Sequence, residues 1–89
     1  MKKSLIIKVF GRVQGVGFRY YTNKKALELD ISGFVRNMPD GSVYIEAEGE
    51  EKQMHDFTNW LKAGPKWARV EDVKIQDMPL QQYRSFLVH

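Results

Sequence analysis

Residues 33–48 have the sequence GFVRNMPDGSVYIEAE, in which a turn separates two strand-like segments. Proline at 39 presets φ, and the Asp40-Gly41 pair tolerates a tight reversal, so residues 38–42 predict the turn. The segment after the turn alternates between two faces, with Val43, Ile45 and Ala47 on one and Tyr44, Glu46 and Glu48 on the other. The pattern therefore predicts a β-hairpin with one buried face and one solvated face.

An amphipathic helix is predicted on each side of this hairpin. From about Phe18 to Leu29, apolar positions recur at helical spacing, at Phe18, at Tyr21 or Thr22, at Ala26 and at Leu29. The second helix begins near the acidic pair Glu50 and Glu51, whose charges suit a helix N-terminus, and ends at Gly64-Pro65. Its apolar stripe consists of Met54, Phe57 and Leu61.

Further strand-like runs complete the chain. They lie at 5–10, ending at Gly11, at 70–75 and, as a short run, at 86–88. The order β-α-β-β-α-β plus a short terminal edge strand predicts an α+β ferredoxin-like (split β-α-β) sandwich, with two helices on one face of an antiparallel sheet. We expect residues 1–89 to form a single domain, because the chain is too short for a second one.

The predicted strand order has a consequence for function. In this fold the hairpin's return strand lies between the first and second strands, so the ends of those two strands meet at one edge of the sheet. Two strand spacings amount to about 10 Å, a gap that an arginine, a loop and a phosphate-sized ligand can span. We therefore expect Arg19 and Asn37 to meet there.

Residues 11–19, GRVQGVGFR, form a glycine-rich turn that we call the glycine loop. Glycines at 11, 15 and 17 permit positive φ, so successive N–H groups can converge on one point. The helix that follows adds free N–H groups and its positive dipole end, and Arg19 adds a planar fork of donors. The loop is thus a candidate phosphate site.

The chemistry available to such a pair limits the substrate. Arg19 and the loop amides can neutralise phosphoryl oxygens, and the carboxamide of Asn37 can hold a water, but neither side chain is a proper general acid or base. An alkoxide leaves a phosphate monoester poorly without a proton or a metal, whereas a carboxylate is already a stable leaving group. The pair suits a mixed carboxylic-phosphoric anhydride.

The glycine loop and residues 33–43 together resemble the two signature segments of the acylphosphatase family, and the similarity covers nearly the whole chain. The resemblance implies metal-independent hydrolysis of acyl phosphates to a carboxylate and inorganic phosphate by small cytosolic monomers that need no cofactor. It implies that Arg19 binds the phosphate and that Asn37 positions the attacking water. Backbone amides of the loop complete the implied phosphate site, at Gln14, Gly15, Val16, Gly17 and Phe18.

Two positions depart from the family pattern, and other polar residues have structural explanations. Asp30 stands where many relatives have a glycine that ends the first helix, and Phe34 replaces a frequent tryptophan, which we interpret as a smaller core residue. Strand alternation and a helix start account for Glu46, Glu48, Glu50 and Glu51. We expect surface or capping roles for His55 and His89, which lack nearby ligands at metal spacing.

Composition excludes several classes of function. The chain has no cysteine, so it lacks disulfides and thiolate sites, which suits a reducing compartment such as the cytoplasm. Lys8 interrupts the apolar N-terminal stretch after three residues, which argues against a signal peptide, and no segment approaches membrane-spanning length. The net charge of +3 only weakly favours anionic partners.

Two alternative functions share this fold. An RNA-recognition module would place stacking aromatics on the sheet, but its sequence signature is missing and Glu46 and Glu48 would repel a phosphate backbone, so no nucleic-acid partner is expected. A noncatalytic ligand-sensing domain would keep the phosphate site without turnover. Dinucleotide-binding and P-loop motifs fail on spacing, because Phe18-Arg19 follows Gly17 and no Gly-Lys-Ser/Thr occurs.

Overall fold

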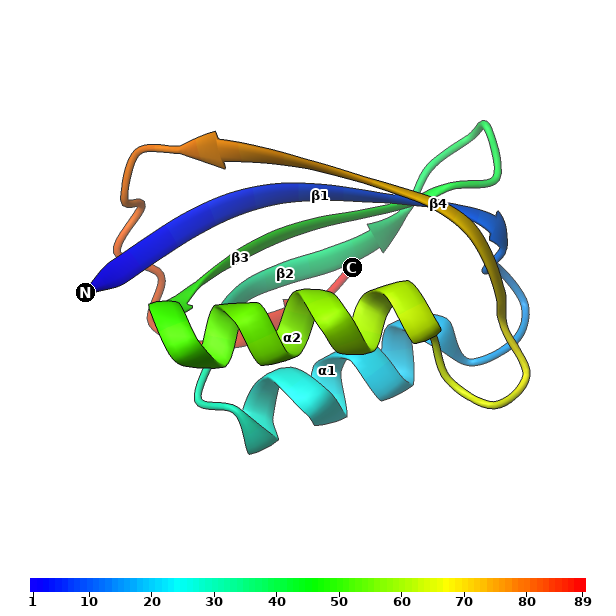
Figure 1. Cartoon of the computed structure of the whole chain (residues 1–89). Helices are drawn as coiled ribbons and strands as arrows, with labels where there is room; N and C mark the ends of the chain where they lie inside the picture. The colour runs from blue at the N-terminus through cyan, green and yellow to red at the C-terminus, as the bar shows by residue number, and fades with distance from the viewer.

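The computed structural model describes residues 1–89 as seven elements of secondary structure (Figure 1). In chain order they are β1 (Lys2–Arg12), α1 (Phe18–Glu28), β2 (Ser32–Asn37), β3 (Val43–Glu50), α2 (Glu51–Ala63), β4 (Arg69–Met78) and β5 (Phe86–Val88). Both helices lie on the same face of a five-stranded sheet. Neither helix has the length and apolar character that crossing a membrane requires.

The strand order β4-β1-β3-β2-β5 confirms the predicted ferredoxin-like arrangement. β3 lies antiparallel between β1 and β2, with Ile45 opposite Ile7 on one side and opposite Val35 on the other. One feature differs from the prediction. The short terminal strand β5 runs parallel to β2, so the sheet is mixed and only the four longer strands form the antiparallel sheet that the pattern indicated.

The core lies between the helices and one face of the sheet. Alternate residues in the middle of β1 and in β3 are buried there, as the alternation predicts, and so is the apolar stripe on α2. They are Leu5, Ile7 and Val9 on β1, Val43, Ile45 and Ala47 on β3, and Met54, Phe57 and Leu61 on α2. On α1 the buried positions are Phe18, Thr22 and Ala26, while Tyr21 is 37% exposed. The sequence left open whether Tyr21 or Thr22 faces the core, and in the structure Thr22 does.

The end of α1 is closed by a residue in the left-handed region. Asp30 has φ 58°, the N–H of Ile31 bonds to the oxygen of Ala26 at 2.8 Å, and the N–H of Asp30 bonds to the oxygen of Leu27 at 3.3 Å. This is the Schellman arrangement in which glycine is usual. Asp30 thus adopts the left-handed conformation for which glycine is usual.

The other face of the sheet, which we call the open face, is less solvated than the alternation indicates. Residues 79–85, the crossing segment, lead from β4 to β5 past this face and cover part of it. As a result Glu48 is only 3% exposed, so the expectation that it lies on a solvated face is wrong. Phe34 also lies on the open face, half-buried against Tyr44 and Tyr83, and is not a core residue.

Candidate active site

A cavity of about 460 Å³ opens at the edge of the sheet where β1 and β2 end. Gly15, Gly17, Phe18 and Arg19 of the glycine loop border it, and so does Asn37 at the end of β2. Arg19 and Asn37 thus border one cavity, as the predicted topology indicates, although 17 residues separate them in the sequence.

The glycine loop has the backbone shape that an anion site requires. Gly15 and Gly17 have φ values of 74° and 78°, in the left-handed region that favours glycine. Gly17 is the N-cap of α1 and no side chain caps the helix, so its first N–H groups have no side-chain acceptor. These groups and the helix dipole favour a bound anion at the start of α1.

Two of the predicted loop residues do not border the cavity. Val16 is partly buried against the core, and the side chain of Gln14 turns toward the β2–β3 turn. Its amide nitrogen donates hydrogen bonds to the backbone oxygens of Met38 at 2.8 Å and Ser42 at 2.9 Å. Gln14 therefore connects the glycine loop to the turn that follows Asn37, a contact that the sequence pattern did not indicate.

The β2–β3 turn is itself held together by Asp40. The carboxylate accepts hydrogen bonds from the backbone N–H of Ser42 at 2.9 Å and from the hydroxyl of Ser42. The side-chain and backbone hydrogen bonds from Ser42 lower the pKa of Asp40. The backbone N–H of Met38 also bonds to the oxygen of Ser42 at 2.8 Å. This network fixes the chain directly after Asn37.

Arg19 is half-buried as a residue, and its guanidinium is oriented by the end of β5. Its Nη1 donates a hydrogen bond to the backbone oxygen of His89, while the backbone N–H of His89 bonds to the oxygen of Val35 at 2.9 Å. One guanidinium N–H group is thereby engaged, and a guanidinium carries five. His89 lies on the surface, as expected, but its backbone contact with Arg19 has no sequence signal.

Side-chain amides supply the remaining polar groups of the cavity. The Oδ1 atoms of Asn37 and of Asn23, on α1, are buried and accept no hydrogen bond from the chain. Tyr20 also borders the cavity and is 61% exposed. From the sequence, Tyr20 is interpreted as a packing aromatic and neither Tyr20 nor Asn23 is assigned to the site, because a polar and an aromatic residue on a helix have no distinctive spacing.

The charge of the cavity is positive. Arg19 borders it, whereas no aspartate, glutamate or lysine does. No group of three or more His, Asp or Glu side chains gathers anywhere in the chain as metal ligands would. The site can therefore bind and orient a phosphoryl group, but it offers no carboxylate as general base.

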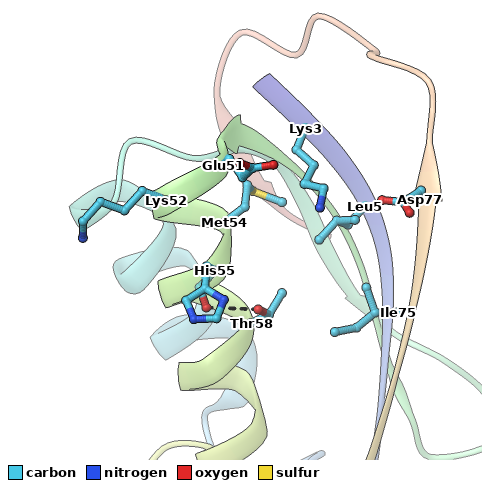
Figure 2. Close-up of a pocket in the computed structure, with 9 residues that line it drawn as sticks. All are labelled: Lys3, Leu5, Glu51, Lys52, Met54, His55, Thr58, Ile75 and Asp77. Atoms are coloured by element: carbon cyan, nitrogen blue, oxygen red, sulfur yellow. Dashed lines mark hydrogen bonds between the residues drawn. The ribbon is translucent and has the colours of Figure 1, made fainter. Parts of the chain in front are cut away.

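A larger cavity of about 670 Å³ lies elsewhere, between α2 and strands β1 and β4 (Figure 2). Its apolar wall consists of Leu5, Met54 and Ile75, and its rim carries charges of both signs. His55 lies on this rim and contacts Asn59 at 3.1 Å, which agrees with a surface role. With mixed charges and no glycine turn, this cavity has no evident anion-binding chemistry.

Comparison with known proteins points to one family. A model of the family described as Acylphosphatase matches residues 5–88. An acylphosphatase of Archaeoglobus fulgidus is 48% identical over 85 residues, which cover 96% of each chain. The crystal structure of an acylphosphatase from Bacillus subtilis superposes with a TM-score of 0.95 at 36% identity, covering 100% of this chain and 99% of that one. An acylphosphatase from Coxiella burnetii also gives a TM-score of 0.95 at 36% identity.

Proposed function

The chain belongs to the acylphosphatase family and is a hydrolase of acyl phosphates, and from this premise we propose how its residues perform the reaction. The backbone N–H groups of the glycine loop and the guanidinium of Arg19 bind the phosphoryl oxygens. The amide of Asn37 positions the water that attacks phosphorus. The observation that carries this proposal is that Arg19, Gly15, Gly17 and Asn37 border one cavity.

The phosphate subsite follows from the donors available. A guanidinium fork matches two phosphoryl oxygens at once, and N–H groups at a helix N-terminus favour negative charge. Within the chain the guanidinium of Arg19 makes one hydrogen bond, through Nη1, so its other N–H groups can bind the ligand. As charge develops on the equatorial oxygens in the transition state, these fixed donors stabilise it without reorganising.

The water subsite follows from the unpaired amide. The Oδ1 of Asn37 is buried and has no donor within the chain, so a hydrogen-bond donor must come from a ligand or from the attacking water. The network around Asp40 and Ser42 holds this asparagine in place. Asn37 then accelerates the reaction mainly by holding the water close to phosphorus in the right orientation. The phosphoryl group itself accepts the proton that the attacking water loses.

The acyl leaving group explains why the site needs little else. Attack of water on phosphorus breaks the bond between phosphorus and the bridging oxygen and releases a carboxylate, which is stable as an anion. Neither a general acid nor a metal is required to assist its departure. We propose that the enzyme is metal-independent, uses no cofactor and releases inorganic phosphate as its second product.

The molecular setting is also a proposal. We infer a single domain over residues 1–89. One core cluster of 15 buried residues supports this, because both helices and strands β1, β2, β3 and β5 contribute to it, and Val70 and Val73 of β4 pack against it. We place the protein in the cytoplasm, because a cysteine-free chain suits a reducing compartment, and we expect a monomer.

Hydrolysis of a small aryl acyl phosphate in excess chelator tests the proposed function. We expect full turnover, and a decrease in kcat of about 10²- to 10³-fold in Arg19→Ala and Asn37→Ala. Matched controls are Arg69→Ala and Asn59→Ala, which remove an exposed arginine and an exposed asparagine outside the cavity and outside the glycine loop. Dependence on added metal, or normal turnover by either site variant, would contradict the proposed mechanism.

A further inference from the structure

The carboxylate of Glu48 joins two distant segments of chain on the open face. Its Oε1 atom accepts hydrogen bonds from the backbone N–H groups of Gln81 at 2.6 Å and Gln82 at 3.2 Å, both in the crossing segment. The hydroxyl of Ser4, on β1, donates to the same oxygen. Glu48 is 97% buried, so these donors must replace the hydrogen bonds that water would give its carboxylate. The same hydrogen bonds hold the crossing segment against the sheet.

The hydrogen bonds keep this buried side chain charged. Burial by itself raises the pKa of Glu48, but the hydrogen bonds from Ser4 and from the backbone of Gln81, Gln82 and Tyr83 outweigh it and lower the pKa below its ordinary value. Hydrogen bonds to an ionised acceptor are roughly twice as strong as neutral ones. Glu48 is therefore a strong anchor for the crossing segment.

The crossing segment leads directly into β5, a strand of only three residues. The oxygen of Ser85 accepts a hydrogen bond from the N–H of Gly33 at 2.9 Å, and the N–H of His89 bonds to the oxygen of Val35 at 2.9 Å. β5 pairs with β2 alone and lies at the edge of the sheet. Because such a short edge strand has little stability of its own, its position depends on the chain that precedes it.

The chain directly after β5 contacts Arg19. The backbone oxygen of His89 accepts a hydrogen bond from Arg19 Nη1, and His89 borders the phosphate cavity together with Val88. A continuous path of chain and hydrogen bonds thus runs from Glu48, near the end of β3, to Arg19, in the first turn of α1. The end of β3 that adjoins α2 and the start of α1 lie at opposite ends of the sheet (Figure 1).

We propose that Glu48 is a positioning residue for the phosphate site. By anchoring the crossing segment it holds β5 against β2, and β5 then presents the oxygen of His89 that orients Arg19. The inference rests on the proposed role of Arg19 in binding the phosphoryl group. Glu48 itself does not border the cavity and does not touch the substrate.

The expected kinetic effect follows from the freedom of the arginine side chain. A guanidinium that is already oriented loses little rotamer freedom when the phosphoryl group binds, whereas a released one must be ordered by the ligand. Loosening β5 should therefore weaken binding of the acyl phosphate and of inorganic phosphate. Once the ligand is bound, the arginine is in place again, so kcat should change less than KM.

The test compares Glu48→Asp with wild type well below the unfolding midpoints of both. The shorter side chain keeps the charge but cannot reach both the crossing segment and Ser4. We expect KM for an aryl acyl phosphate and the inhibition constant of inorganic phosphate to rise together by about fivefold, with kcat changed by less than about twofold. Amide hydrogen exchange should accelerate at Gly33 and His89, whose N–H groups bond across the β2–β5 pair.

Three further variants separate positioning from general destabilisation. Glu48→Gln keeps an acceptor oxygen at the same reach but makes weaker, uncharged hydrogen bonds, so its KM should lie between those of wild type and Glu48→Asp. Met54→Ala destabilises the core on the other face of the sheet, where Met54 is 1% exposed, and should leave KM and phosphate inhibition unchanged. Ser4→Ala removes one donor from the same carboxylate, so a smaller shift in the same direction is expected even if Glu48→Asp does not fold.

The outcomes distinguish this inference from the proposed function. Normal KM and normal phosphate inhibition in Glu48→Asp, or an equal shift in Met54→Ala, would overturn the positioning role. A lower KM in Glu48→Asp would overturn it as well. It would show that the contact with the oxygen of His89 hinders Arg19 from binding the ligand and does not prepare it for binding. Full activity in Arg19→Ala would instead overturn the proposed function itself, whatever the Glu48 variants do.

Discussion

Gln14 donates a hydrogen bond of 2.8 Å from its side-chain amide to the backbone oxygen of Met38, the residue that follows Asn37. The same nitrogen reaches the oxygen of Ser42 at 2.9 Å. One side chain therefore connects the loop that binds phosphate in the proposed mechanism to the turn that carries the asparagine. The separation of these two parts of the site depends on this contact.

Gln14→Leu should impair catalysis more than stability. Misplacing catalytic groups by about 1 Å can lower the rate on the order of 10²-fold, whereas losing one or two hydrogen bonds lowers the free energy of unfolding by about 1–3 kcal/mol. We expect kcat/KM for an aryl acyl phosphate to fall by about 10- to 100-fold. The control is Gln76→Leu, at an exposed position of β4. Unchanged kcat/KM in Gln14→Leu would show that the contact does not set the geometry of the site.

Arg19→Lys should not restore the function of the arginine. A lysine keeps the positive charge but loses the planar fork of donors that contacts His89 and, in the proposed mechanism, binds two phosphoryl oxygens. We expect kcat/KM to fall by about 10²-fold or more and inorganic phosphate to inhibit less strongly. Steady-state kinetics with phosphate as competing ligand measure both. If Arg19→Lys matched wild type while Arg19→Ala were inactive, charge alone would be sufficient at this position.

Glu48 should make folding stability depend on pH in the acid range. Its pKa is lowered in the folded protein relative to an exposed glutamate, so the unfolded chain binds a proton more readily. The stabilisation is therefore fully present above the pKa of the unfolded chain and is lost as pH falls through the lowered pKa of the folded state. Urea unfolding of wild type and Glu48→Gln from about pH 7 to about pH 3 should show their stability difference shrinking with acid. A difference that stays constant over that range would contradict the assignment.

Asp30→Gly should stabilise the protein without changing its activity. Asp30 has φ 58°, a conformation that costs a residue with a side chain roughly 1 kcal/mol and costs glycine little. Part of this gain is offset by the greater freedom of glycine in the unfolded chain, so we expect about 0.5 kcal/mol more stability. Urea unfolding measures the midpoint, and kinetics should give an unchanged kcat/KM. Asp30→Val is the contrasting variant and should be destabilised, because a β-branched residue is strained at this φ.

Much of the fold could be predicted because its signals are local. The alternation of residues 43–48 and the stripe of Met54, Phe57 and Leu61 identify the elements and their buried faces, and the strand order then places Arg19 near Asn37. The glycine loop could be recognised because positive φ at Gly15 and Gly17 requires a particular residue type. Periodicity and backbone constraints are the properties that a single sequence records most directly.

The burial of the open face could not be predicted, because it depends on a segment whose sequence has no periodicity. Residues 79–85 form no helix or strand, yet they bury Glu48 and place Tyr83 against Phe34. Alternation assigned Glu48 to the open face correctly but could not show that a later segment covers that face. The contact between Arg19 and His89 was missed for the same reason, since it joins positions 70 residues apart through a backbone oxygen.

The path of β5 has a practical consequence for handling the protein. Because the backbone of His89 contacts Arg19 at the cavity, a peptide fused after His89 would begin beside the proposed phosphate site. The N-terminal residue Met1 instead lies near Glu50, close to the start of α2 and away from that cavity. Purification tags and reporter fusions therefore belong before Met1, where they leave the entrance to the cavity free.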